Sequence, residues 1–143
     1  MTDGHKLDSA EGALAFLLAG KATVTLKSEV TGDHLTFQVR KWKKAQRGSL
    51  HFVSVRTGND FANVGVIRDG SSFSRGKKAD VDFDDVRVKA FRYDFAHLCD
   101  AKQLPPKCEV WHEGQCGRCG RPLTDPTSIQ IGLGPDCREK MGL

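Results

Sequence analysis

Three cysteines near the C-terminus have the residue type and spacing of a metal-binding site. Cys116 and Cys119 form a Cys-x-x-Cys pair flanked by glycines, and Cys137 follows after a loop of 17 residues. The glycines allow the backbone to turn tightly, so that both thiolates of the pair point at one ion. Thiolates in such a turn are zinc ligands, and a structural zinc ion takes four ligands in a tetrahedron. The sequence therefore predicts one structural Zn²⁺ ion held by these thiolates and a fourth residue.

Two residues compete for the fourth position. His112 lies three residues upstream of the Cys-x-x-Cys pair and gives a Cys3His site with the pattern H-x3-C-x2-C-x17-C. Cys108 lies further upstream and gives an all-cysteine site instead. A strand carrying either residue can reach the turn. We favour His112, because its shorter spacing costs less loop-closure entropy.

Catalytic zinc motifs do not fit this sequence. Zinc deaminases use His-x-Glu with a distant Pro-Cys-x-x-Cys, whereas His112 and Glu113 are adjacent and the cysteine pair begins three residues later. A metalloprotease His-Glu-x-x-His would need histidine where Cys116 stands. Four protein ligands would also leave no position for a reactive water. No phosphate-binding loop or nucleophile signature appears elsewhere, so we expect a protein without enzymatic activity.

The tail resembles an uncharacterised family of small phage, prophage and plasmid proteins. Its pattern is a histidine, then CGRCGR-x-Leu-Thr-x-Pro-x-Ser, then Gly-Ile-Gly-Pro-x-Cys. The matching positions are His112, Cys116, Cys119, Leu123, Thr124, Pro126, Ser128, Gly132, Gly134, Pro135 and Cys137, with Leu133 in place of isoleucine. The resemblance is specific over residues 110–143 and weaker upstream. It implies a mobile-element origin and a metal site, and the family has no established activity to transfer.

Positive charge is concentrated in the middle of the chain. The whole chain carries +4, whereas residues 40–78 contain ten basic and two acidic residues, a net charge of +8. The basic residues gather in two segments that are expected to be turns, with an aromatic residue beside them. The predicted nucleic-acid contacts are Lys41, Trp42, Lys43, Lys44, Arg47, Arg75, Lys77 and Lys78, with Arg118 and Arg121 from the cysteine turn. Turns on one sheet edge would form a single positive patch on which Trp42 stacks a base. The alternative is that these are solvated loops.

Hydrophobic periodicity predicts an α+β fold. The segment Asp8-Ser9-Ala10-Glu11 resembles a capping box for a helix from about Ser9 to Ala19. The second helix starts at Asp84 or Asp85 with an apolar stripe of Val86, Ala90, Phe91, Phe95 and Leu98. Between them, alternating segments separated by turns at 31–34, 57–60 and 69–70 predict an antiparallel meander of four or five strands. Either Phe52 and Ser54 or Val53 and Val55 face the core. A short final helix should follow Cys137, and this arrangement is similar to treble-clef zinc modules, which take two ligands from the helix rather than one.

Length and composition limit the class of protein further. The 143 residues divide at Leu104-Pro105-Pro106 into a sheet domain, residues 1–107, and a zinc-binding module, residues 108–143. No apolar run approaches the ~20 residues of a membrane span, and the N-terminus lacks a signal peptide. We therefore expect a cytoplasmic protein with reduced cysteines.

Two classes of function are compatible with these features. The first is a zinc-binding accessory protein of a phage or mobile element that associates with nucleic acid. The second is a protein-binding regulator or inhibitor of a host complex, such as a polymerase, a ribosome, a nuclease or anti-phage defence (CRISPR) machinery. It would use a sheet edge and the acidic run from Asp80 to Asp85.

Overall fold

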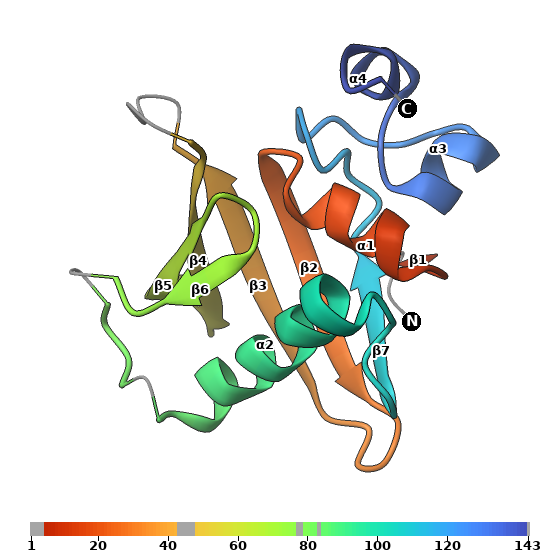
Figure 1. Ribbon diagram of the computed structural model, residues 1–143. Helices are drawn as coiled ribbons and strands as arrows, with labels where there is room; N and C mark the ends of the chain where they lie inside the picture. Colours follow the sequence, from red (N-terminus) through yellow and green to blue (C-terminus); the bar gives the residue numbers. More distant parts are fainter. Residues whose placement is uncertain (1–4, 43–47, 77–78, 83, 143) are drawn as a thin grey trace.

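Seven strands form one antiparallel sheet in the computed structural model, which describes residues 5–42, 48–76, 79–82 and 84–142 (Figure 1). In spatial order the strands are β1 (His5–Lys6), β7 (Cys108–His112), β2 (Lys21–Ser28), β3 (His34–Lys41), β4 (Leu50–Thr57), β5 (Asp60–Arg68) and β6 (Ser72–Ser74). The strands β2 to β6 are neighbours in chain order. The predicted antiparallel meander and the α+β class are therefore confirmed.

The inward face of the sheet is clearest in β4, where burial alternates along the strand. Val53 and Val55 of β4 are fully buried, whereas Phe52 next to them is 39% exposed. Of the two faces that the sequence allowed for β4, the valine face is thus the one that packs in the core. Antiparallel pairing places Val39 opposite Val53 and Phe37 opposite Val55, so these side chains lie on the same face.

Two strands extend the sheet beyond the predicted meander. β7 pairs with β2 on one side, with Val110 opposite Leu26, and with β1 on the other, with Trp111 opposite Lys6. The predicted domain boundary between residues 107 and 108 falls immediately before β7. β7 is an interior strand, between β1 and β2, and leads directly into the cysteine-rich tail. The division into two domains stays a prediction.

Two helices cover one face of the sheet (Figure 1). α1 (Ala10–Leu17) begins within the predicted capping segment, where the Ser9 side chain accepts a hydrogen bond of 3.0 Å from the Gly12 N–H. α2 (Val86–Ala96) is capped by Asp85, which accepts from the Arg87 N–H at 2.9 Å. α2 continues into one π-helical segment, η1 (His97–Ala101). The caps fix where each helix enters the sheet face.

The core between α2 and the sheet is aromatic. The ring of Phe91 lies 5.1 Å from that of Phe37 and 5.0 Å from that of Phe73. The stripe predicted for this helix was wrong at Val86, which is 76% exposed, whereas Val88 is fully buried. Val86 is the first residue of α2, and the buried positions are Val88, Phe91 and Phe95, which follow the i, i+3, i+7 spacing of one helix face.

The tail after β7 forms two short helices beyond one end of the sheet, next to α1 (Figure 1). α3 (Pro126–Ile131) is capped by Asp125, which accepts a hydrogen bond of 3.0 Å from the Ser128 N–H. α4 (Pro135–Lys140) is the predicted final helix and contains Cys137. Among the described residues, none of the helices has the length and apolar character needed to cross a bilayer.

Candidate metal centre

The Cys-x-x-Cys pair lies at the tip of a small hairpin. Gln115 and Pro122 form an isolated antiparallel bridge, and the Cys116 N–H donates to the Arg121 carbonyl at 2.8 Å. The Gly120 N–H closes the turn on the Cys116 carbonyl, also at 2.8 Å, and Gly120 has a φ of +80° that a side chain would strain. This local geometry directs both thiol groups to the same side of the turn.

Cys137 approaches the hairpin from the first turn of α4. The chain leaves α3 at Gly132, whose φ is +86°, and Pro135 then starts α4 at a position where its missing N–H is not needed. The Sγ atoms of Cys116, Cys119 and Cys137 all lie within 4.8 Å of one another. The three cysteines that the sequence singled out are therefore brought together in a cluster that could hold a metal ion.

Hydrogen-bond donors surround the sulfur atoms of this cluster. The N–H groups of Gly134 and Arg118 both lie 3.4 Å from the Cys116 Sγ, and the Arg118 guanidinium lies 3.7 Å from the Cys137 Sγ. Burial raises the pKa of the Cys116 thiol, but the backbone donors outweigh burial and bring this pKa down to about 7. Donors aimed at sulfur stabilise the thiolate, which is the form that binds metal.

Neither candidate for the fourth ligand lies in the cluster. His112 is fully buried, and both of its ring nitrogens bond to backbone: Nε2 donates to the Ile129 carbonyl at 2.5 Å, and Nδ1 accepts from the Gly114 N–H at 2.9 Å. Burial lowers the pKa of His112, so its imidazole is neutral. The geometry therefore makes His112 a link between the end of β7 and α3 and does not support the Cys3His arrangement.

Cys108 belongs to a different group of side chains. Its Sγ donates to the Asp94 carboxylate of α2 at 3.1 Å. Burial raises the pKa of the Cys108 thiol, and the adjacent carboxylate raises it further. A thiol that stays protonated is a poor metal ligand, so the geometry does not support the all-cysteine alternative either.

The tail packs on the side chain of Phe16 in α1. Its ring is 1% exposed and lies 5.6 Å from the His112 ring. A Cβ atom added at Gly117 would lie 2.7 Å from the Phe16 ring, and one at Gly132 would lie 2.6 Å from it. Phe16 was not predicted from the sequence, because no local signal identifies its contacts with Gly117 and Gly132, which lie far along the chain.

The basic residues are less completely described. Lys41 ends β3, and both Lys41 and Arg75 are exposed. Trp42 is 45% exposed and its ring meets that of Phe52 edge-on, with centroids 5.5 Å apart. Arg121 is exposed, whereas Arg118 is partly buried against Cys137. The rest of the predicted patch, namely Lys43, Lys44, Arg47, Lys77 and Lys78, falls outside the described residues, so a single basic edge remains a prediction.

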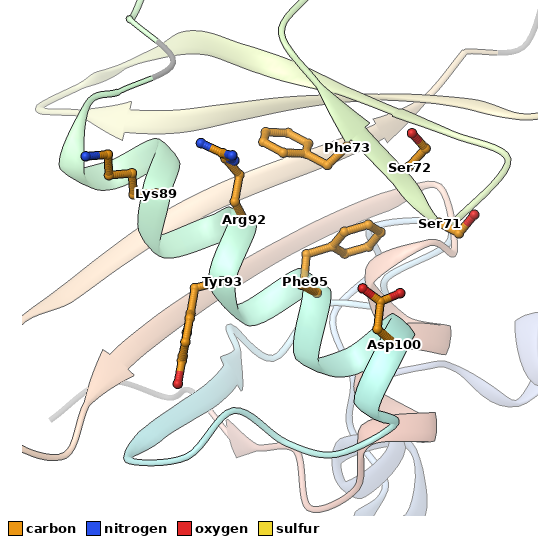
Figure 2. Close-up of a pocket in the computed structure, with 9 residues that line it drawn as sticks. Ser71, Ser72, Phe73, Lys89, Arg92, Tyr93, Phe95 and Asp100 are labelled. Carbon is orange, nitrogen blue, oxygen red and sulfur yellow. The ribbon is translucent and has the colours of Figure 1, made fainter.

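Two cavities lie on either side of α2. Figure 2 shows the first, of about 610 Å³, where Arg92 points toward Phe73 of β6, and Ser71, Ser72 and Asp100 line the same opening. The second has a volume of about 980 Å³ and lies between α2, the β2–β3 hairpin and the segment before β7. Asp94 and Cys108 line this second cavity. Neither cavity includes a cysteine of the cluster.

Comparison with known protein families matches only the tail. Residues 111–142 match a family of unknown function, DUF6011. The matched segment begins within β7, includes all three clustered cysteines and ends after α4. No curated protein and no solved structure matches the chain significantly. The match supports the resemblance of this tail to an uncharacterised family, and it transfers no activity.

Proposed function

We propose that this chain is a non-enzymatic zinc protein that associates with nucleic acid. The observation that carries the zinc assignment is the cluster of three Sγ atoms within 4.8 Å of one another. A ligand set made only of thiolates is soft and favours zinc over magnesium or calcium. Cys116 and Cys137 are buried with Leu133, which is too small a core to hold a tail of this length together. A zinc ion would supply the missing stability.

The proposed metal site has three protein ligands. Three thiolates and Zn²⁺ sum to a charge of −1, which the Arg118 guanidinium beside Cys137 would offset. Arg118 is thus assigned to the metal site instead of to a phosphate. A hairpin opposite one helix cysteine is comparable to a treble-clef module that lacks one helix ligand.

Elemental analysis of protein purified without added metal tests this assignment. We expect one zinc ion per chain in the wild type and none in Cys119→Ala. Cys108→Ala is the matched control, because Cys108 is also a partly buried thiol but bonds to Asp94, and it should keep its zinc. His112→Asn should keep zinc and lose stability. A folded wild type without metal would refute the proposal, and zinc loss from a folded His112→Asn would restore histidine as the fourth ligand.

Association with nucleic acid is supported by charge and by exposed aromatic rings. The chain has a net charge of +4, and its positive residues concentrate between 40 and 78. Trp42 and Phe52 are exposed in the same part of the sheet. Binding through phosphates should weaken by about 0.9 log units per contact for each tenfold rise in salt, which a titration at several salt concentrations measures.

A protein-binding role is the second candidate, because one observation favours it. Val86 and Tyr93 of α2 are 76% and 51% exposed, and both line the cavity of about 980 Å³ beside the β2–β3 hairpin. Val30, at the tip of this hairpin, is 71% exposed. Exposed apolar side chains around a cavity are typical of protein contacts. A partner that is retained from a lysate after nuclease treatment, and lost in Tyr93→Ser, would favour this second role.

A further inference from the structure

One face of the sheet carries no described helix. α1 and α2 both lie over the opposite face, and α3 and α4 lie beyond its end (Figure 1). The residues on the open face follow from the strand register, because paired residues of antiparallel strands point to the same side. Arg40 pairs with Phe52, and Gln38 pairs with both Thr23 and Ser54. The open face therefore combines polar side chains with exposed aromatic and cationic ones.

The aromatic side chains of the open face are exposed and preorganised. Trp42 follows β3 and lies edge-on to Phe52 of β4, with the rings 5.5 Å apart and at 89°. Both rings are between a third and a half exposed. Phe61 of β5 lies on the same face, paired with Arg56, whose guanidinium stacks on its ring at 5.5 Å. Such rings offer flat apolar surfaces to a planar ligand without first having to be uncovered.

Cations outnumber acids on this face. The register places five exposed basic residues of the central strands on it, namely Lys21, Lys27, Arg40, Arg56 and Arg68. Its acids are Glu109 and Glu113, which form ion pairs with Lys6 at 3.4 Å and Arg56 at 3.6 Å. Among the described residues, no acid forms an ion pair with Arg40. The face thus presents uncompensated positive charge beside aromatic rings.

We propose that a single-stranded nucleic acid binds across this open face. Its bases stack on Trp42 and Phe52, and its phosphates are held by Arg40 and by Lys21 and Lys27 of β2. This inference rests on the proposed association with nucleic acid and names its site. Stacking needs unpaired bases, because the faces of paired bases are covered inside a duplex. Side-chain oxygens of Thr23, Gln38 and Ser54 lie between the cations and add hydrogen bonds that tolerate different bases.

Direct titration of fluorescently labelled oligonucleotides at low salt tests this site. The wild type should bind a single-stranded oligonucleotide more tightly than a duplex of the same length. Phe52→Leu and Trp42→Leu should each weaken the single-strand Kd about 5- to 100-fold, the loss expected for one stacked base. Arg40→Gln should weaken binding to all sequences and reduce the salt dependence by about one contact.

Matched controls lie on the other side of the molecule. Tyr93→Leu removes an exposed aromatic ring, and Lys89→Gln removes an exposed cation, both from α2. Neither should change binding to the single strand. Thermal unfolding of every variant separates a lost contact from a lost fold. In a Trp111→Phe background, Trp42 is the only tryptophan, and the oligonucleotide should quench its fluorescence.

Each contrary result has a distinct meaning. If the wild type binds neither oligonucleotide at low salt, the proposed nucleic-acid association itself fails. If the wild type binds but folded Phe52→Leu, Trp42→Leu and Arg40→Gln bind equally well, the association stands and this site is wrong. Equal affinity for duplex, or a loss in Tyr93→Leu as large as in Phe52→Leu, would also overturn the site. A nuclease-resistant protein partner that is lost only in Phe52→Leu would reassign the open face to a protein.

Discussion

His51 is a buried histidine that is unrelated to the metal cluster. It is 3% exposed, and its Nε2 bonds to the Leu18 carbonyl at 3.0 Å, whereas its Nδ1 is buried without a partner among the described residues. Burial lowers the pKa of His51, and Lys41, its partner in the sheet, lowers it further. The folded protein therefore favours the neutral imidazole.

This burial predicts loss of stability in mild acid. In the unfolded chain, the His51 imidazole takes up a proton with a pKa of about 6.5. In the folded protein its pKa is lower, so it stays neutral to a lower pH. The free energy of unfolding should thus be unaffected by His51 at high pH and should fall as the pH drops below about 6.5. Urea unfolding in mildly alkaline and mildly acidic buffer should show a smaller fall in His51→Phe than in the wild type. His34→Gln, which changes an exposed histidine, should behave as the wild type, and equal slopes in all three proteins would contradict the prediction.

At the scale of elements, the contact between α1 and the cysteine hairpin depends on a missing side chain. A Cβ atom at Gly117 would lie 2.7 Å from the Phe16 ring and 2.9 Å from the Phe16 carbonyl oxygen. The carbonyl belongs to the helix backbone and cannot move aside easily. The hairpin can therefore pack on α1 only with glycine at this position.

Gly117→Ala should accordingly destabilise the protein by about 1–3 kcal/mol, as overpacking does elsewhere. Gly134→Ala is the control from the same tail, because a Cβ atom there meets no atom within 4 Å and the φ of −69° suits any residue. Gly134→Ala should lower the free energy of unfolding clearly less than Gly117→Ala does. Chemical denaturation of both variants with zinc in excess measures the difference, and equal losses would show that the packing on Phe16 is unimportant.

Local patterns predicted the parts of this molecule that are determined locally. Cysteine spacing identified Cys116, Cys119 and Cys137, and alternation with turn residues identified β2 to β6. β7 has only five residues and β1 only two, so neither shows enough alternation to reveal its place in the sheet. The bonds of His112 to residues before and after the cluster also depend on tertiary packing. The role of His112 as the fourth ligand, which spacing alone predicts, stays a prediction.

At the scale of the whole molecule, β7 lies inside the sheet although it follows the predicted domain boundary. A chain ending at residue 107 would lack a strand that pairs with five residues of β2, together with the buried side chain of Val110. We expect this fragment to lose cooperative thermal unfolding by circular dichroism. A chain ending at residue 113 keeps β7 and should still unfold cooperatively, at a lower temperature than the full chain. Cooperative unfolding of the shorter fragment would show that residues 1–107 are an independent domain.

The sheet edge at β5 has a further consequence for how this protein can meet other chains. β6 pairs only with Val66 to Arg68 of β5, so Asn63 lies beyond the pairing with β6. Both backbone groups of Asn63 bond to Asp80. The Asn63 N–H donates to the Asp80 carboxylate at 3.1 Å, and the Asn63 carbonyl accepts from the Asp80 N–H at 2.8 Å. A single aspartate thus occupies backbone groups that would otherwise recruit a foreign strand, and its negative charge discourages stacking of copies. The fold therefore disfavours strand addition at Asn63.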